Sequence, residues 1–298
     1  LLMKPLIAIP MGDAAGIGPE ITVKTIASEE AFKYARMIVV GNKRVLETAC
    51  KFSDINLKIN PIPSIRDFND QPGVMNLIER GDIDFSTFRQ GEIQGQCGKA
   101  AYDCIEEVVR MAMSGDVDAV ATTPINKESL KAGHVNFIGH TEIFGQLTDT
   151  PDPLTMFQVR DLRVFFLTRH MSLVNAIRSL TPEKVCDYAI RCTHALEKLG
   201  LKEPRMTIAA INPHGGEHGL FGTEDDDILL PGIEMAKARG ISITGPKPAD
   251  SVFHFALQGK YDAVLSPYHD QGHIATKMVD FHRTISITNG MPILRTSV

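Results

Sequence analysis

Short apolar runs alternate along the chain with longer segments in which apolar residues recur every three or four positions. Residues 6–9 and 37–40 have the composition of short buried strands, and a third such run spans 117–122. Residues 101–112 carry apolar side chains at helical spacing, and Gly115 follows as a helix stop. This alternation of strands with amphipathic helices predicts an α/β fold.

The second half of the chain continues the pattern. Residues 181–183 (Thr-Pro-Glu) are typical of a helix start, with a hydroxyl N-cap followed by proline at the first helical position. Further strands are expected at 164–167, 206–211 and 262–265. Residues 60–96 are rich in Pro, Gly, Asp and Gln, so we expect loops or hairpin arms there. No segment has the composition of a linker, so two domains would share a chain that crosses between them more than once.

Three apolar runs, 164–168, 207–211 and 263–266, are each followed within three residues by a histidine, namely His170, His214 and His269. Ligands of open α/β sheets bind outside the carboxyl ends of the strands. Neutral imidazole is a good ligand for Zn, Co, Ni or Fe, and three protein ligands leave positions open for a substrate. The shared placement therefore predicts a metal site in which the ion acts as a Lewis acid on a substrate hydroxyl. A lone histidine is more often an ordinary hydrogen-bonded residue, and the three do not form a short local metal motif.

The bulk composition narrows the classes of partner. The chain has 298 residues, 43% apolar and 22% charged, an ordinary globular balance for one large or two moderate domains. A net charge of −5 with scattered basic residues argues against a nucleic-acid partner. No apolar run approaches the roughly 18 residues of a membrane span.

The five cysteines include no Cys-x-x-Cys pair, which argues against a disulfide framework or a thiolate zinc site. Cys104 and Cys192 fall on apolar helical stripes, so we expect them in the core. The first ten residues lack a signal-peptide pattern. We therefore expect a reducing, cytoplasmic setting.

Polar groups in several other segments are candidates for ligand binding. Residues 12–20 form a glycine-rich loop that opens a helix, but they match neither the Gly-x-Gly-x-x-Gly fingerprint nor a P-loop, and a plain strand–turn–helix corner remains possible. Residues 122–127 offer hydroxyls, an amide and a cation after another strand. Lys277 and Arg295 are either oxyanion ligands or solvated surface residues.

Six short motifs occur in order along the chain: Pro124–Lys127, Gly139–Glu142, Asn212–His214, Gly245–Asp250, Tyr268–Gly272 and Arg295–Val298. Together they resemble the 4-hydroxythreonine-4-phosphate dehydrogenase (PdxA) family, and the match runs from Gly12 to the last residue. The loop ending in Gly16–Glu20 is also similar to the opening loop of isocitrate and isopropylmalate dehydrogenases, whose fold this family shares.

The resemblance implies a two-domain α/β/α sandwich of the isocitrate/isopropylmalate dehydrogenase-like type. Residues 1–128 and 262–298 would form the first domain and 129–261 the second, with the active-site cleft between them. The protein would be a homodimer in which His170, His214 and His269, drawn from both subunits, bind one divalent ion (Zn, Co, Mg, Mn or Ni).

The resemblance also implies a substrate site made of His140, Thr141, Lys277, Ser286 and Arg295. Where the biosynthetic enzymes of the family usually carry an asparagine nine residues before the arginine, this chain has Ser286. Ser286 and the segment 156–172 are more similar to the catabolic branch, which acts on D-threonate or D-erythronate 4-phosphate and yields dihydroxyacetone phosphate and carbon dioxide.

NAD would accept the hydride near the loop that holds Asp250. The alcohol would become a β-keto acid and then lose carbon dioxide, and the metal would stabilise first the alkoxide and then the enolate. Lys277, Asp250 or Asp270 would move the proton, and the family pattern leaves open which.

Two further departures from the family pattern stand out. Ala14 replaces the usual proline of the opening loop, and the chain stops at Val298 where relatives usually continue, which suggests a fragment.

Three alternatives stay open at this point. One is the 4-phosphohydroxy-L-threonine dehydrogenase of vitamin B6 biosynthesis. The second is a metal-dependent lyase or hydrolase without a nicotinamide. The third is a non-catalytic phosphometabolite-binding protein.

Overall fold

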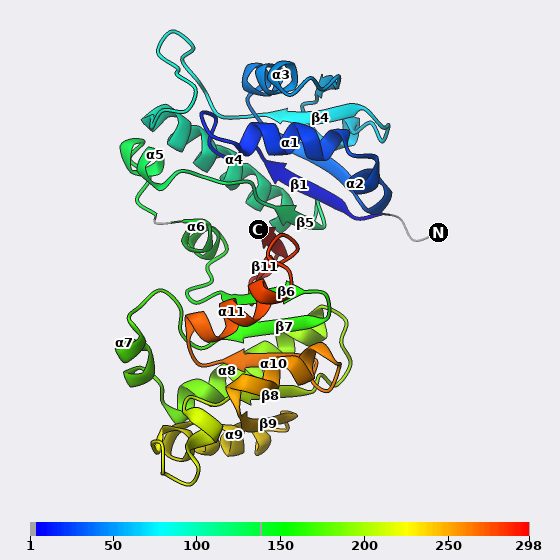
Figure 1. Cartoon of the computed structure of the whole chain (residues 1–298). Coiled ribbons are helices and arrows are strands. Elements are labelled where there is room, and N and C mark those ends of the chain that lie inside the picture. Colours follow the sequence, from blue (N-terminus) through cyan, green and yellow to red (C-terminus); the bar gives the residue numbers. More distant parts are fainter. Residues whose placement is uncertain (1–3, 138, 298) are drawn as a thin grey trace. The chain divides into compact units, whose positions relative to one another are not determined.

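The computed structural model describes residues 4–137 and 139–297, and the chain divides into two compact units. Unit 1 consists of Leu1–Pro153 with Met291–Ser297, and unit 2 of Leu154–Gly290. Each unit is a layer of strands flanked by helices (Figure 1).

The boundaries of the two units differ from those of the predicted domains. The predicted domains were separated between residues 128 and 129 and between residues 261 and 262. Residues 129–153 belong to unit 1 because their two helices pack against the long helix at 95–113. Residues 262–290 belong to unit 2 because their strands pair with strands of that unit.

The sheet of unit 1 has the strand order β3-β4-β2-β1-β5-β12, and its paired strands are parallel. The strands are β1 (Leu6–Pro10), β2 (Arg36–Gly41), β3 (Lys58–Pro61), β4 (Val74–Glu79), β5 (Ala119–Ala121) and β12 (Arg295–Ser297). The helices are α1 (Gly18–Ala27), α2 (Glu29–Tyr34), α3 (Lys43–Phe52), η1 (Ile65–Asp67), α4 (Gly95–Met113), α5 (Lys127–Ala132) and α6 (His140–Leu147).

The sheet of unit 2 has the order β11-β6-β7-β10-β8-β9. The pairs β11–β6 and β6–β7 are antiparallel, and the remaining pairs are parallel. The strands are β6 (Leu154–Val159), β7 (Leu162–Phe166), β8 (Met206–Ala209), β9 (Ile243–Lys247), β10 (Ala263–Ser266) and β11 (Ile285–Asn289). The helical segments are α7 (Leu173–Arg178), α8 (Pro182–Lys198), η2 (Pro213–Gly216), η3 (Asp225–Leu229), α9 (Leu230–Lys237), α10 (Ala249–Leu257) and α11 (His269–Val279).

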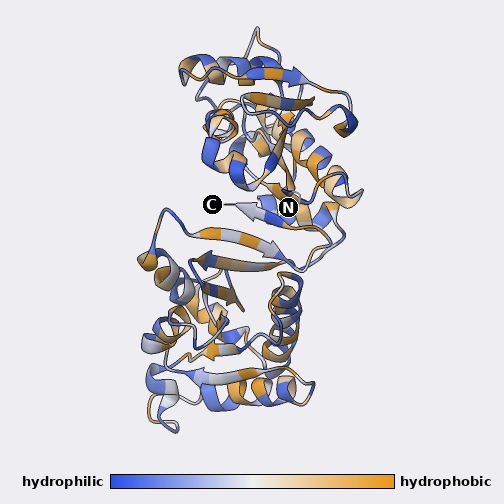
Figure 2. Ribbon diagram, turned by 90° about the vertical axis from the view of Figure 1, so that its right-hand side faces the viewer, coloured by the Kyte–Doolittle hydropathy of each residue, from blue (hydrophilic) through white to orange (hydrophobic). Residues whose placement is uncertain are grey.

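The segments with the strongest local signals form as predicted. The predicted strands at 6–9 and 37–40 are β1 and β2, and their residues are largely buried. The predicted helix start at 181–183 opens α8, where the Thr181 hydroxyl accepts a hydrogen bond from the Lys184 amide at 3.2 Å. Hydrophobic residues occur on both the strands and the helices of the two units (Figure 2). All five cysteines are buried and unbridged, as expected for Cys104 and Cys192.

Three local expectations were wrong. Residues 60–96 are not loops throughout, because Val74–Glu79 forms β4 between β2 and β3. The strand is hard to predict from the sequence because the polar residue Asn76 interrupts its apolar run. Its side chain is 1% exposed and is hydrogen-bonded to Asn60 and Asn69. The strand expected at 206–211 ends at Ala209, and the expected loop at 245–250 begins within β9.

Among the described residues, no helix is long and apolar enough to span a membrane.

Candidate functional site

The three predicted metal ligands follow three neighbouring parallel strands of unit 2. In the order β7-β10-β8, His170 follows β7, His269 opens α11 after β10, and His214 lies in η2 after β8. The sheet thus delivers all three imidazoles to its carboxyl edge, where ligands of parallel sheets bind.

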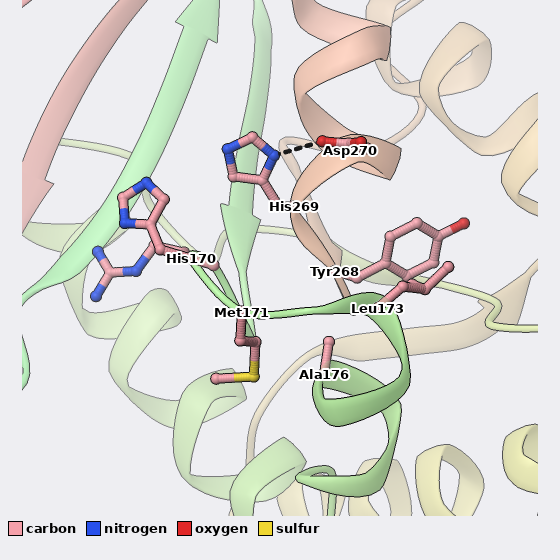
Figure 3. Close-up of a pocket in the computed structure, with 8 residues that line it drawn as sticks. His170, Met171, Leu173, Ala176, Tyr268, His269 and Asp270 are labelled. Carbon is pink, nitrogen blue, oxygen red and sulfur yellow. Dashed lines mark hydrogen bonds and ion pairs between the residues drawn. The ribbon is translucent and has the colours of Figure 1, made fainter.

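Two of these histidines line one cavity of about 240 Å³ (Figure 3). The ring centroids of His170 and His269 are 5.7 Å apart, with the planes inclined by 48°. Met171 lines the cavity from the segment before α7, and Leu173 and Ala176 line it from α7 itself. The cavity therefore combines apolar side chains with two imidazoles, and Arg169, Tyr268 and Asp270 also line it.

Asp270 orients the His269 ring. Its Oδ1 lies 2.6 Å from Nδ1 of His269, the contact drawn as a dashed line in Figure 3. A carboxylate at Nδ1 favours the tautomer whose proton is on that nitrogen, and the lone pair of Nε2 then remains for a ligand. This is the usual arrangement behind a metal-binding histidine.

His214 does not line this cavity, and its ring contacts Phe221 at a centroid distance of 6.5 Å. Within residues 4–137 and 139–297, no group of three or more His, Cys, Asp or Glu side chains is arranged to hold a metal ion. The structure therefore brings together two of the three predicted ligands, while the third lies at the end of the adjacent strand.

Asp225 is a residue of this site that the sequence reasoning missed. Its side chain is 0% exposed, and its two carboxylate oxygens accept hydrogen bonds from the backbone amides of Ile211 and Asn212 at 2.8 and 2.9 Å. These amides lie directly before the turn in which His214 has a positive φ of 56°. Asp225 thus fixes the loop that carries His214. The run of three aspartates at 225–227 was the only signal for it in the sequence.

His273 is a second residue that was missed. Its ring stacks on that of His269 at a centroid distance of 3.7 Å, and its Nδ1 lies 2.8 Å from the His269 carbonyl oxygen. Burial, opposed by this hydrogen bond, lowers the pKa of His273 to about 4. The neutral ring packs between His269, Phe157 and Phe166. The spacing of four residues from His269 on one helix face could have identified it.

In unit 1, Arg295 forms a buried cationic site. It is 4% exposed, and its Nε and Nη2 donate hydrogen bonds to the Thr122 hydroxyl at 3.1 and 2.8 Å. Burial lowers its pKa to about 10, so the guanidinium stays charged at pH 7. From the residues alone, surface solvation was the default expectation for Arg295, and this expectation was wrong.

His140 lies in the electrostatic field of Arg295. Burial, and then the charge of Arg295, lowers its pKa to about 3. Its Nε2 is buried and has no hydrogen-bond partner among the described residues. Thr141 follows it as a half-buried residue of α6. A buried cation beside an unsatisfied imidazole suits a substrate that carries an oxyanion and a hydroxyl.

We predict that His140 makes the stability of the protein depend on pH. Because its folded-state pKa lies below the unfolded value of about 6.5, its contribution is complete above pH 6.5 and declines as the pH falls towards 3. Between pH 7 and pH 5 the wild type should lose about 2 kcal/mol of unfolding free energy more than His140→Asn. Urea denaturation of both proteins with a chelator present measures this difference. Equal losses would contradict the assignment.

The other predicted site residues all lie in unit 2. Lys277 is exposed on α11, with its Nζ 5.3 Å from the centre of the Phe281 ring. Asp250 is exposed in the first turn of α10, and Ser286 is half-buried on β11 opposite Phe157. None of these three lines the cavity of His170 and His269.

The two α/β units, with histidines at strand ends and a buried arginine, define an α/β metabolic enzyme of the isocitrate dehydrogenase-like fold. The chain belongs to the PdxA family. The family model described as "Pyridoxal phosphate biosynthetic protein PdxA" matches residues 33–298.

Individual relatives agree with this assignment. A protein of Clostridium botulinum named "Putative D-threonate 4-phosphate dehydrogenase" is 55% identical over 295 residues, which cover 99% of this chain and 88% of that protein. The 4-hydroxythreonine-4-phosphate dehydrogenase of Klebsiella pneumoniae superimposes with a TM-score of 0.94 at 36% identity, covering 99% of this chain and 89% of that one. The 4-hydroxythreonine-4-phosphate dehydrogenase of Burkholderia phymatum superimposes with a TM-score of 0.91 at 36% identity. The match covers 99% of this chain and 90% of that one. These relatives are named dehydrogenases of phosphorylated hydroxy compounds, a class that uses NAD or NADP.

Proposed function

We propose that this chain is an NAD- and divalent-metal-dependent dehydrogenase that oxidatively decarboxylates D-threonate 4-phosphate or D-erythronate 4-phosphate. The observation that carries the proposal is the cavity that both His170 and His269 line, with Asp270 hydrogen-bonded to His269. The choice of substrate is supported by the relatives, because identity is 55% to a protein named for D-threonate 4-phosphate and 36% to one named for 4-hydroxythreonine 4-phosphate.

The donor set fits a divalent metal. Three imidazoles at the ends of three neighbouring strands are ligands for Zn, Co or Ni, and Asp270 leaves Nε2 of His269 available. Since His214 lies outside the cavity of the other two, we propose that the ligands come together in a homodimer that shares them between subunits. A bound ion would supply Lewis-acid catalysis for the oxidation and for the loss of carbon dioxide.

The chain's own residues would bind substrate and move the proton. Arg295, with His140 and Thr141, would bind the anionic part of the substrate, and Ser286 would contact its carbon chain. The hydride of the substrate carbinol would go to NAD, near Asp250, and the hydroxyl proton to a base. Asp270 is engaged by His269, which leaves Lys277 or Asp250 as the better candidates for that base. Metabolism of this kind is cytoplasmic, and we propose that location.

The test is a substrate panel. Purified protein with NAD and Zn, Co, Ni, Mn or Mg would receive D-threonate, D-erythronate and 4-hydroxy-L-threonine, each as its 4-phosphate. We expect NADH formation, with the highest kcat/KM for one of the first two. Absence of NADH with all three substrates would reject the function, and saturable NAD binding would exclude a lyase or hydrolase that uses no nicotinamide.

The 4-phosphate of hydroxy-L-threonine, the vitamin B6 substrate, is the second candidate, because two solved structures of similar fold are named 4-hydroxythreonine-4-phosphate dehydrogenases. We predict that Ser286→Asn raises the ratio of kcat/KM for the 4-phosphate of hydroxy-L-threonine over that for D-threonate 4-phosphate by about tenfold, because an amide can bind the substrate amine that a hydroxyl binds less well. Steady-state kinetics with both substrates measure this ratio. An unchanged ratio would remove Ser286 from the specificity residues.

A further inference from the structure

Helix α11 of unit 2 carries three polar side chains along one face. His269, His273 and Lys277 follow one another at intervals of four residues, which places them in a row with a rise of about 6 Å between neighbours. His269 is a proposed metal ligand and Lys277 a proposed proton-transfer residue, while the proposed function gives His273 no task. A ligand that extends along α11 from the ion towards Lys277 therefore passes the ring between them.

The His273 ring has one nitrogen in use and one available. Its Nδ1 lies 2.8 Å from the carbonyl oxygen of His269. A carbonyl oxygen can only accept, so Nδ1 donates its proton and Nε2 of the neutral ring carries the lone pair. Within the described part of the chain Nε2 makes no hydrogen bond, and it is not one of the buried polar atoms that lack a partner. It therefore reaches solvent, where a ligand can donate to it.

Packing fixes the direction of this nitrogen. Measured between ring centroids, His269 lies 3.7 Å from His273 with the planes inclined by 12°, and Phe157 and Phe166 lie 4.2 and 4.4 Å away. An acceptor that its neighbours hold in place loses little conformational freedom on binding. The ring is therefore preorganised for a ligand that presents a donor at this position.

Ser286 lies on the same face of the sheet as this ring. It is paired with Phe157 across the antiparallel strands β11 and β6, and directly opposed side chains of such a pair point to one face. α11 packs against β6 on that face, where Phe157 contacts His273 (Figure 1). His273 therefore belongs to the same neighbourhood as the proposed substrate residue Ser286, and both lie within unit 2.

The chemistry of the proposed substrate indicates which of its groups a lone pair can bind. D-threonate 4-phosphate carries a carboxylate at carbon 1, hydroxyls at carbons 2 and 3, and a phosphate at carbon 4. Loss of carbon dioxide after the oxidation requires a ketone at carbon 3, so the 3-hydroxyl gives up its proton in the reaction. The carboxylate and the phosphate are acceptors and would repel a further lone pair. The 2-hydroxyl is the donor that remains.

We propose that His273 is a substrate-contact residue whose Nε2 accepts a hydrogen bond from the 2-hydroxyl, next to the carbon that is oxidised. The inference rests on the proposed function for the identity of the substrate. It assigns different tasks to two residues. His273 requires a donor on carbon 2, and Ser286 discriminates between the hydroxyl and the amine that can supply it.

The test measures binding in the absence of NAD, so that no substrate is turned over. The protein loaded with Zn²⁺ would be titrated calorimetrically with D-threonate 4-phosphate and with its 2-deoxy analogue. We expect the wild type to bind the first at least about tenfold more tightly, because the analogue leaves Nε2 without its donor. His273→Phe retains an aromatic ring beside His269 but removes the acceptor, and should reduce this preference about five- to tenfold.

Two further variants complete the comparison. His273→Gln can place its amide oxygen near the position of Nε2, and should recover a preference of at least about threefold for the 2-hydroxyl. His194→Phe, at an exposed histidine of α8 in the same unit, should keep the wild-type preference. Mass spectrometry should find the same zinc content in all three variants. If His273→Phe weakens both ligands equally or loses zinc, His273 acts through His269 as a positioning residue and the inference is wrong.

The outcomes separate this inference from the proposed function. If NADH forms with D-threonate or D-erythronate 4-phosphate but the wild type and His273→Phe show the same preference, the function stands and the contact is rejected. If no substrate of the panel yields NADH but the preference is present in the wild type and lost in His273→Phe, the contact stands and the function fails.

Discussion

Replacing His269 with alanine is expected to remove the bound divalent ion and to lower kcat/KM by about three orders of magnitude. The ring is held on two sides, by Asp270 at Nδ1 and by the stacked His273. Its loss would remove one donor of the proposed triad, and with the ion several kcal/mol of charge stabilisation in the oxidation step. Metal content by mass spectrometry and initial rates with saturating metal measure both effects.

His214→Ala is a stricter test of the proposed metal site, because His214 does not line the cavity of His170 and His269. We expect it to remove the ion as well. His194→Ala is the matched control, a histidine exposed on α8 of the same unit. A His214→Ala protein that retains a full equivalent of metal would reject this residue as a ligand, whatever His269→Ala does.

Asp225→Ala should lower the free energy of unfolding by about 2–5 kcal/mol, because it leaves the part-buried amides of Ile211 and Asn212 without their acceptor. The loop before His214 would lose its attachment, so the affinity for the metal should fall by about ten- to a hundredfold. Urea denaturation of the metal-free protein gives the first quantity, and a metal titration of the folded protein gives the second.

Asp226→Ala is the control for this change, because the Asp226 carboxylate is exposed. The free energy of unfolding of this variant should be within about 0.5 kcal/mol of the wild-type value. If Asp225→Ala were as stable as Asp226→Ala, the loop would not depend on the buried carboxylate. If stability fell and metal affinity did not, Asp225 would support the fold without positioning His214.

The elements that could be predicted from the sequence are those whose stability depends on residues close together in the chain. The period of the helix at α4 and the cap and proline at Thr181 and Pro182 act within a few residues, so the sequence displays them. β4 was missed because its stability comes from strands on both sides and from an asparagine satisfied by a distant loop. β12 is only three residues long and forms by pairing with β5, far away in the sequence.

The same distinction applies to the site. The three histidines were predicted because each directly follows an apolar run, and a sheet edge collects strand ends. The buried pair of Arg295 and Thr122 was not predicted, since 173 positions separate its two residues. Asp225 was missed because a carboxylate that binds backbone amides leaves no pattern of side-chain types.

The placement of β12 has a consequence for biosynthesis. Unit 2 is one continuous stretch inserted between Pro153 and Met291, whereas unit 1 needs Arg295 and its strand from the far side of that insertion. A ribosome adds about 5–20 residues per second, so β5 waits roughly 9–35 seconds for its edge partner. During this interval unit 1 has an open sheet edge at β5, and the site that we propose for the anionic part of the substrate lacks Arg295. We therefore expect the nascent chain to acquire substrate affinity only after the inserted unit has been made.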